Sequence, residues 1–183
     1  MEKEATGLDI INIIDQVQHG QIEAFRSVVT RYQGPLFLYS RHLLGNQTEA
    51  EDAVQEIFLK AYRHLHRYRP EFPFAAWLYK IAYNHCLNVI RRRSLWKRFL
   101  HTHPRHDSTA LLPQDESHLD AWLAALLPAE RNIVVLRALE ERPFDEIAAI
   151  MNCPSATARK RYERARKKLK QQFINQGEVV FHE

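Results

Sequence analysis

Apolar residues recur at helical spacing along almost the whole of this sequence, and that regularity constrains the fold more than any other feature. Residues such as Phe25, Val28 and Tyr32 are three or four positions apart, so they share one face of a helix. The 183 residues include only five glycines, whereas sheet-rich folds need glycine at many turns and bulges. The sequence therefore predicts an all-α protein with about four helices, a linker and then four shorter helices.

Prolines and capping residues predict where several of these helices begin and end. Gly34-Pro35 is expected to break the first long helical stretch. Thr48 and Glu51 fit a capping box, in which each side chain accepts a hydrogen bond from the other residue's amide. Pro73 is expected at the first position of a long helix that ends near Arg93.

A stretch rich in His, Pro, Ser and Asp follows residue 94, where the helical periodicity fades. Such a composition is typical of a linker between domains. The sequence predicts two small helical domains, at residues 1–95 and 117–175, a flexible linker at 96–116 and a C-terminal tail at 176–183. Within the first domain the run LDIINIIDQV is expected to form an extra helix, or else a surface for a partner.

Positive charge is concentrated in one short segment near the C-terminus. The whole chain has a net charge of only +4, but residues 159–170 contain eight lysines and arginines and a single acidic residue, Glu163. Like charges that crowd together repel, so this density predicts a polyanionic partner or a compensating structure. Taken alone, such a run is more often a solvated helix face than a binding site.

The residues just before the basic run favour the binding interpretation. Phe144–Met151 has the pattern of a short amphipathic helix, Asn152-Cys153-Pro154 fits a tight turn, and Ser155 can cap the next helix. Two helices joined in this way form a helix-turn-helix, whose second helix enters the major groove of DNA. An apolar stripe of that helix is expected to face the domain core, while basic residues, Lys168 among them, point outward. The stripe consists of Ala158, Tyr162, Ala165, Leu169 and Phe173.

Three separated blocks of the sequence resemble the bacterial sigma factors of the extracytoplasmic-function group, within the sigma-70 family. They are EAEDAVQEIFLKAYRHLHRY, PFAAWLYKIAYNHCLNVIRRR and LPAERNIVVLRALEERPFDEIAAIMNCPSATARKRYERARKKL. The resemblance implies a region 2 bundle and a region 4 helix-turn-helix domain. It also implies a transcription initiation factor that binds core RNA polymerase and directs it to promoter DNA through the −10 and −35 elements. An anti-sigma factor is the further partner that it implies.

For the first block the resemblance implies a surface that docks on the clamp coiled coil of RNA polymerase. Asp52, Gln55 and Glu56 fall at helical spacing and make an acidic and polar face that suits a basic partner helix. Without the resemblance, these acids would be interpreted as favourable charges in the first turns of a solvated helix. The predicted polymerase-binding residues are Glu51, Asp52, Gln55, Glu56 and Phe58.

The second block resembles the region that melts and reads the −10 element. Bases that leave a duplex need flat aromatic surfaces with cations nearby, and this block interleaves aromatic residues with arginine and lysine. Aromatic clusters more often belong to a core, and Tyr62, Phe74 and Trp77 are assigned there. The predicted −10 contacts are Arg67, Arg69, Phe72, Lys80, Asn84, Asn88 and Arg91, although the arginines at 91–93 also fit a plain cationic helix end.

For the third block the resemblance implies that the basic helix reads the −35 element in the major groove. Two departures from the family pattern are Ala156-Thr157-Ala158, where Gly-Thr-Val is frequent, and Lys160, where a small polar residue is frequent. The stretch Glu141–Phe144 also replaces a turn that usually contains glycine. The predicted −35 contacts are Thr157, Arg159, Lys160, Arg161, Glu163 and Arg164.

Composition and motifs exclude several other classes of protein. No stretch reaches ~18 uninterrupted apolar residues, and the acidic N-terminus lacks a signal-peptide pattern, so a cytoplasmic protein without membrane insertion is predicted. Cys86 and Cys153 lie far apart within apolar helical patterns, which fits buried, reduced thiols better than a disulfide.

Two rival functions are weaker interpretations of this sequence. No catalytic motif stands out, so neither an enzyme nor a cofactor is predicted. The histidines His101, His103 and His106 could bind a metal, but their Pro-containing segment favours a solvated linker. A stand-alone helix-turn-helix regulator is the other alternative, and it would need neither a polymerase-docking helix nor aromatic residues that read single strands.

Overall fold

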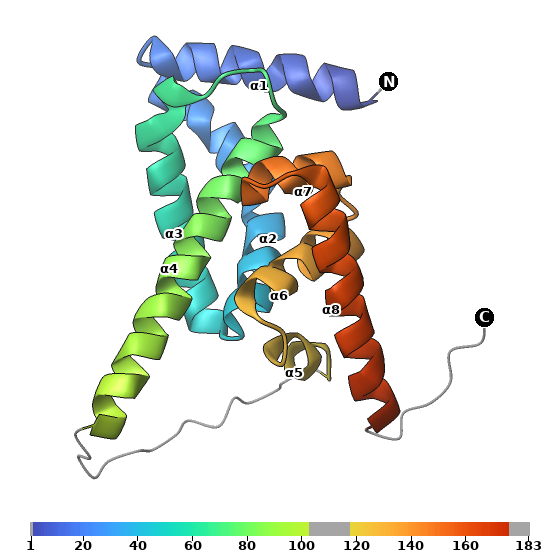
Figure 1. Ribbon diagram of the computed structural model, residues 1–183. Coiled ribbons are helices and arrows are strands. Elements are labelled where there is room, and N and C mark those ends of the chain that lie inside the picture. The colour runs from blue at the N-terminus through green and yellow to red at the C-terminus, as the bar shows by residue number, and fades with distance from the viewer. Residues whose placement is uncertain (1, 103–117, 176–183) are drawn as a thin grey trace. The chain divides into compact units, whose positions relative to one another are not determined.

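All regular elements in the described residues are helices, which confirms the predicted all-α class. The computed structural model describes residues 2–102 and 118–175 (Figure 1). Four long helices come before residue 103 and four after residue 117. The last of these has 21 residues and is longer than the first three helices, although it was expected to be shorter. The helices are α1 (Glu2–Gln18), α2 (Phe25–Leu44), α3 (Gln47–His64), α4 (Phe74–Thr102), α5 (His118–Ala124), α6 (Pro128–Val134), α7 (Phe144–Met151) and α8 (Ser155–Asn175). Shorter turns are η1 (Ile22–Ala24), η2 (Leu65–Arg67) and the π-helical η3 (Val135–Leu139).

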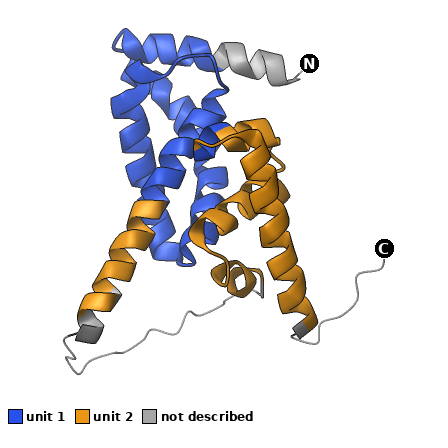
Figure 2. Ribbon diagram, viewed as in Figure 1, with its two compact units in different colours: residues 1–86, 149–151 blue, residues 87–148, 152–183 orange. Residues whose placement is uncertain are grey.

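The chain divides into two compact units, which Figure 2 shows in different colours. The first comprises residues 1–86 and 149–151, and the second comprises residues 87–148 and 152–183. Two helical domains were predicted, whereas the particular boundaries at residues 95 and 117 stay a prediction. In the parts of the chain that the structure describes, no helix is long and apolar enough to cross a membrane.

The first unit is built on α2 and α3, which pack against each other along much of their lengths. Ala50, Ala53 and Ala61 of α3 are fully buried, and such small residues let two helix backbones approach closely. Large side chains from α2, α3 and α4 fill the rest of the core, and burying each contributes roughly 1.5–3 kcal/mol. They include Leu36, Tyr39, Leu43, Leu44, Ile57, Leu78 and Tyr79.

The N-terminal helix α1 belongs to this first unit. Ile10 and Ile14 are buried, one helical turn apart, where α1 packs on α2. The prediction that the apolar run forms an extra helix is therefore confirmed. A side-chain hydrogen bond ties two other helices of the unit together, because Lys60 Nζ of α3 donates to His85 Nδ1 of α4 at 2.6 Å.

Two predictions of helix ends in this unit are wrong. Asn46, not Thr48, is the N-cap of α3, because its Oδ1 accepts from Glu49 N at 2.8 Å and helical geometry begins at Gln47. Pro35 does not break the helix as predicted but lies inside α2. It removes one backbone donor, and burial of the same helix face on both sides of it outweighs that loss.

The long helix α4 also differs from its predicted extent. It starts at Phe74, and Trp77 N donates to Pro73 O at 3.3 Å, so Pro73 occupies the cap position and not the first helical position. It continues beyond Arg93 to Thr102, into residues that were expected to belong to the linker. The remainder of the predicted linker, residues 103–116, lies outside the described residues.

A buried arginine organises the start of the second unit. Arg131 Nε donates to Leu123 O at 2.7 Å and its terminal nitrogen donates to Ala124 O at 3.0 Å, so the guanidinium caps the C-terminus of α5. Burial lowers the pKa of Arg131 below its usual value. Trp122 of α5 and Phe173 of α8 add an aromatic contact, with ring centroids 4.1 Å apart.

The turn between η3 and α7 contains a non-glycine residue in the left-handed backbone conformation. Glu141 has φ of 52°. Arg142 N donates to Leu136 O at 2.9 Å, and the Arg142 side chain pairs with Glu146 one turn into α7. These bonds hold the turn closed although a non-glycine residue is strained in this conformation.

Replacing Glu141 with glycine is therefore expected to stabilise the protein. Relief of the left-handed strain outweighs the entropy that glycine adds to the unfolded chain, so unfolding in urea should require roughly 1 kcal/mol more free energy. Asp145→Gly, in the right-handed α7, is the matched control and should lose roughly 0.5–1 kcal/mol. Equal destabilisation by both variants would contradict the strain argument.

Candidate nucleic-acid interface

The helix α8 is anchored by the apolar stripe that the sequence predicts. Ala158 and Ala165 are fully buried. The ring of Tyr162 packs edge-on against Phe144 of α7, with centroids 5.7 Å apart. Because one face of α8 is held against the unit, the opposite face of the helix is fixed toward solvent.

The turn before α8 has the compact geometry of a helix-turn-helix. Asn152 has φ of 50°, a left-handed conformation that asparagine tolerates better than most residues. Cys153 N then donates to Ala148 O at 3.0 Å, which closes the end of α7. The chain therefore changes direction within the three residues between α7 and α8, and the next helix begins at Ser155.

The predicted cap of α8 is wrong by one residue. The carbonyl of Pro154 accepts from Thr157 N at 2.9 Å and from Ala158 N at 3.1 Å, so Pro154 occupies the N-cap position. Ser155 is already the first helical residue. Its Oγ is buried and has no hydrogen-bond partner among the described residues, so the side chain does not cap the helix.

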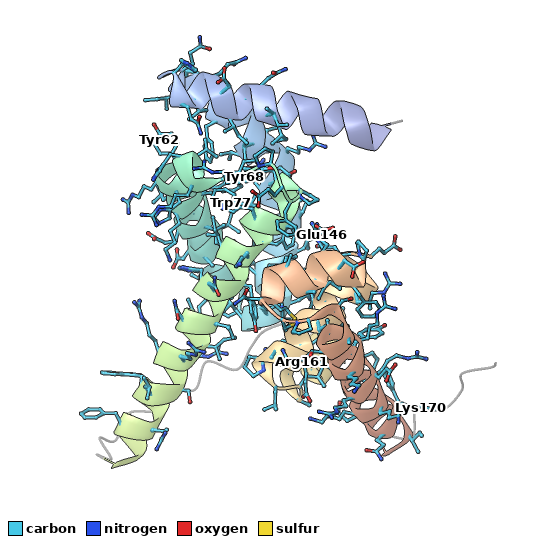
Figure 3. The ribbon with its side chains drawn as sticks, turned by 45° about the horizontal axis from the view of Figure 1, so that its top comes forward. Tyr62, Tyr68, Trp77, Glu146, Arg161 and Lys170 are labelled. Atoms are coloured by element: carbon cyan, nitrogen blue, oxygen red, sulfur yellow. The ribbon has the colours of Figure 1, made fainter. Side chains whose placement is uncertain are left out.

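The first half of α8 presents a polar and mostly cationic face. Arg161 is half-buried, and Figure 3 labels it together with Lys170 farther along the same helix. The guanidinium carbon of Arg159 lies 5.2 Å from the centroid of the Phe144 ring, a cation–π contact that orients the side chain. The exposed members of the predicted −35 set are Thr157, Arg159, Lys160, Glu163 and Arg164.

Lys168 is exposed, as the sequence predicts, but its ammonium group is paired with another helix of the unit. Its Nζ donates to both carboxylate oxygens of Glu130, at 2.6 and 2.9 Å, and Glu130 is buried. Glu130 also accepts from Leu127 N at 3.2 Å at the start of α6. Burial alone would raise the pKa of Glu130, but the hydrogen bonds from Lys168 and Leu127 outweigh it and lower that pKa. The pair thus fastens α8 to α6.

The predicted polymerase-binding residues lie on α3 in two different environments. Glu51, Asp52, Gln55 and Glu56 are exposed, on the side of the helix away from its buried alanines. Phe58 is only 8% exposed, and its ring packs edge-on against Phe25 with centroids 6.4 Å apart. Phe58 therefore supports α3 from within the core.

The loop before α4 is held by a cluster of aromatic side chains. Tyr68 packs edge-on against Phe74 and Trp77, with centroids 5.3 and 5.6 Å apart, and Figure 3 shows Tyr68 and Trp77 in this region. Burial raises the pKa of the Tyr68 hydroxyl, which donates to Phe72 O at 2.9 Å. Phe74 is buried and Trp77 half-buried, as predicted, whereas Tyr62 is 38% exposed and is not a core residue.

The predicted −10 residues lie on this loop and on one row of α4. Phe72 is 57% exposed although its carbonyl is held by Tyr68. The spacing of residues 80, 84, 88 and 91 puts their side chains on one side of a helix. Within the predicted set Arg67, Arg69, Phe72, Asn84, Asn88 and Arg91 are exposed, and Lys80 is half-buried.

The family of this chain follows from comparison with known sequences. The family model for sigma-70 region 2 matches residues 28–95, and the model for sigma-70 region 4 matches residues 119–169. The chain belongs to the extracytoplasmic-function group of the sigma-70 family. This sigma factor is therefore a transcription initiation factor, and the stand-alone regulator is not favoured.

Individual relatives match this chain over most of their own length. The ECF RNA polymerase sigma-E factor of Haemophilus influenzae is 34% identical over 84% of this chain and 89% of its own. The ECF RNA polymerase sigma factor SigW of Bacillus subtilis is 28% identical over 87% of this chain and 94% of its own. Among solved structures, CnrH in complex with the cytosolic domain of CnrY has a TM-score of 0.69 at 25% identity, covering 89% of this chain and 96% of that one.

Cysteine and metal chemistry have little support in this sigma factor. Both cysteines are free, with Cys86 buried and Cys153 half-buried. Burial raises the pKa of the Cys86 thiol to about 12, so it stays protonated near neutral pH. No metal-binding group of three His, Cys, Asp or Glu occurs among the described residues. His103 and His106 lie outside them, and so does the side chain of His101.

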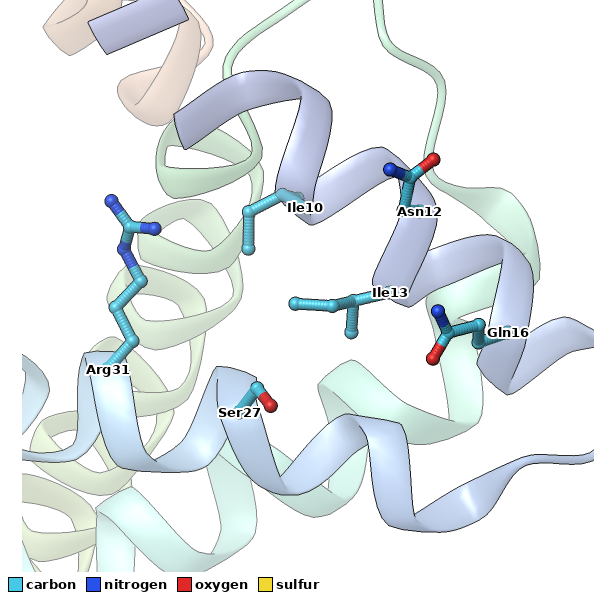
Figure 4. Close-up of a pocket in the computed structure, with 6 residues that line it drawn as sticks. All are labelled: Ile10, Asn12, Ile13, Gln16, Ser27 and Arg31. Carbon is cyan, nitrogen blue, oxygen red and sulfur yellow. The ribbon is translucent and has the colours of Figure 1, made fainter. Parts of the chain in front are cut away.

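A surface groove of about 450 Å³ lies between α1 and α2 of the sigma factor. In Figure 4, Ser27 and Arg31 of α2 face Ile10, Ile13 and other residues of α1 across it. Arg31 is the one charged residue that lines it. A groove with a single cation and no acidic or nucleophilic partner fits the packing of two helices better than a catalytic site.

Replacing Glu130 with glutamine tests the link between α8 and α6. The neutral amide removes the ionic part of the Lys168 bond, so the variant should lose about 1 kcal/mol of unfolding free energy at pH 7. Because the folded pKa lies below the ordinary value of 4.5, this difference is fully present above pH 4.5 and disappears as the pH falls through the folded pKa. Urea unfolding of both proteins between pH 7 and pH 3 measures it, and a difference that stays constant with pH would contradict the assignment.

Proposed function

We propose that this sigma factor reads the −10 element with α4 and the loop before it, reads the −35 element with α8, and docks on core RNA polymerase through α3. The observation that carries the −35 part is the anchored α8, whose first half presents cations and polar groups after a helix-turn-helix turn. Arginine and lysine side chains there can reach guanine edges, while neighbouring cations neutralise phosphates. The proposed −35 contacts are Thr157, Arg159, Lys160, Arg161, Glu163 and Arg164.

The proposed −10 contacts combine a displayed ring with a row of hydrogen-bonding side chains. The exposed ring of Phe72 can stack on an unpaired base, and the loop that carries it is already held by Tyr68. Asn84 and Asn88, one turn apart on α4, have amides that can donate to and accept from base edges. Arg67, Arg69, Lys80 and Arg91 supply positive charge around them.

The proposed docking surface is the exposed acidic face of α3. Glu51, Asp52, Gln55 and Glu56 would meet a basic helix of core RNA polymerase, where opposite charges speed the encounter and fix its register. Phe58 would act indirectly, because its burial keeps the helix in place.

Regulation by an anti-sigma factor is also proposed. CnrH was solved in complex with the cytosolic domain of CnrY, and the sigma factor RpoE of Bartonella quintana in complex with the anti-sigma factor NepR. We extend such a partner to this chain, and with it a cytoplasmic location and a role without catalysis of its own. Boundaries at residues 95 and 117, with a linker and a C-terminal tail, complete the proposed organisation.

Run-off transcription tests the function as a whole. Core RNA polymerase is mixed with fragmented DNA of the host, with and without this protein. Transcripts that depend on the protein are the expected result, and their start sites reveal the −10 and −35 sequences together. DNA binding without new transcripts would favour a repressor instead.

Arg164→Ala should weaken promoter binding and relax base preference within the −35 element. Loss of a base-edge contact in the groove costs roughly 1–3 kcal/mol. Lys170→Ala is the control, because Lys170 is an exposed cation outside the proposed contacts and should leave base preference unchanged. Selection of bound sequences from a randomised −35 library measures both, and identical preferences in wild type and Arg164→Ala would refute the groove assignment.

Asp52→Lys should weaken binding to core RNA polymerase about ten-fold or more, because a repulsive charge would face the basic partner helix. Glu23→Lys makes the same reversal on an exposed acid outside the proposed surface and should bind normally. Equilibrium binding to labelled core enzyme gives the comparison, with helix content checked by circular dichroism. Normal binding by Asp52→Lys would remove α3 as the docking surface.

A further inference from the structure

Three large apolar side chains lie exposed near the end of α4, within the second unit. Leu95 is 64% exposed, Trp96 63% and Phe99 56%. The rings of Trp96 and Phe99 stack, with centroids 6.0 Å apart and planes inclined by 23°. Exposed apolar side chains gathered in this way indicate a binding surface, whereas single exposed residues do not.

Cations surround these side chains on the same side of the helix. Helical spacing puts Arg91, Leu95 and Arg98 in one row and Arg92, Trp96 and Phe99 in the adjacent row. The three arginines are exposed. The whole of α4 contains no aspartate or glutamate, so this helix itself contributes only positive formal charge near the rings.

We propose that this Trp96 surface, made of Arg91, Arg92, Leu95, Trp96, Arg98 and Phe99, binds single-stranded DNA. Flat rings accept unpaired bases by stacking, and arginines beside them neutralise the phosphates of the same strand. Duplex DNA keeps its bases stacked on one another, so it offers these rings no partner. An acidic protein could meet the charges, but it would not need two stacked rings.

The position of the surface favours the strand that becomes unpaired at the promoter. Asn88 and Arg91, both proposed −10 contacts, precede Leu95 at spacings of seven and four residues and so share its row. A strand that leaves Asn88 along α4 would meet the Trp96 surface next. This step rests on the proposed function for the identity of the strand, whereas the binding chemistry does not.

The test measures binding of the full chain to a fluorescein-labelled oligodeoxythymidine of about 16 nucleotides, the upper length of typical single-strand sites. Fluorescence anisotropy is recorded for that strand and for its duplex with oligodeoxyadenosine. The double variant Trp96→Ala with Phe99→Ala should bind the single strand about ten-fold more weakly or worse, and the duplex as before. Trp96→Phe, which keeps a ring, should stay within about two-fold of wild type.

Matched variants separate stacking from other effects. Leu127→Ala removes an equally exposed apolar side chain, 63%, from the start of α6 and should change nothing. Arg92→Gln should lower single-strand affinity and reduce the salt dependence by about one released counterion. Unchanged single-strand binding by the double variant overturns the proposal, and so does an equal loss of single-strand and duplex binding. Because the assay uses neither promoter nor polymerase, its failure is distinct from failure of the proposed function.

Discussion

Repulsion among the eight cations of α8 is the constraint on which the second unit depends. Glu130 relieves part of it from within, since its buried carboxylate holds Lys168 at 2.6 Å. Glu163 lies four residues before Lys167, the favourable order for a helical ion pair. The guanidinium group of Arg159 makes a cation–π contact with the ring of Phe144. Contacts within the unit therefore compensate some of the positive charges of α8. The cations that are not compensated suit a polyanionic partner.

In the first unit, the loop before α4 combines an exposed ring, Phe72, with a backbone that is held in place. Tyr68 is buried against Phe74 and Trp77, and its hydroxyl holds the Phe72 carbonyl. The backbone is thus fixed next to a side chain that stays exposed. A loop ordered in advance loses less conformational entropy when it binds, so the same stacking contact yields more affinity. Burial of alanines on α3 similarly directs its acids outward.

Local patterns in the sequence predict much of this fold and part of its site. Helical periodicity gives the all-α class, the α8 stripe and the order of the helices, because these depend on neighbours within one turn. The pairing of Glu130 with Lys168 joins residues 38 positions apart, and no local pattern contains it. Arg131 is similar, since a charged residue between Glu130 and Asn132 is expected at the surface and is buried here as the cap of α5. Competing caps mislead for another reason: Asn46 and Thr48 both suit the role, and only the helix start decides between them.

The two long basic helices differ in where their aromatic side chains point. On α8, Tyr162 packs on Phe144 and Phe173 packs on Trp122, so the exposed side offers hydrogen bonds and charge without flat rings. On α4, Trp96 and Phe99 point outward between arginines. Paired DNA is read through groove edges and phosphates, while unpaired DNA is held by stacking. Helices rich in arginine and aromatic residues can therefore suit either paired or unpaired DNA. A helix with its rings buried and its arginines exposed suits paired DNA, whereas a helix with both exposed suits unpaired DNA.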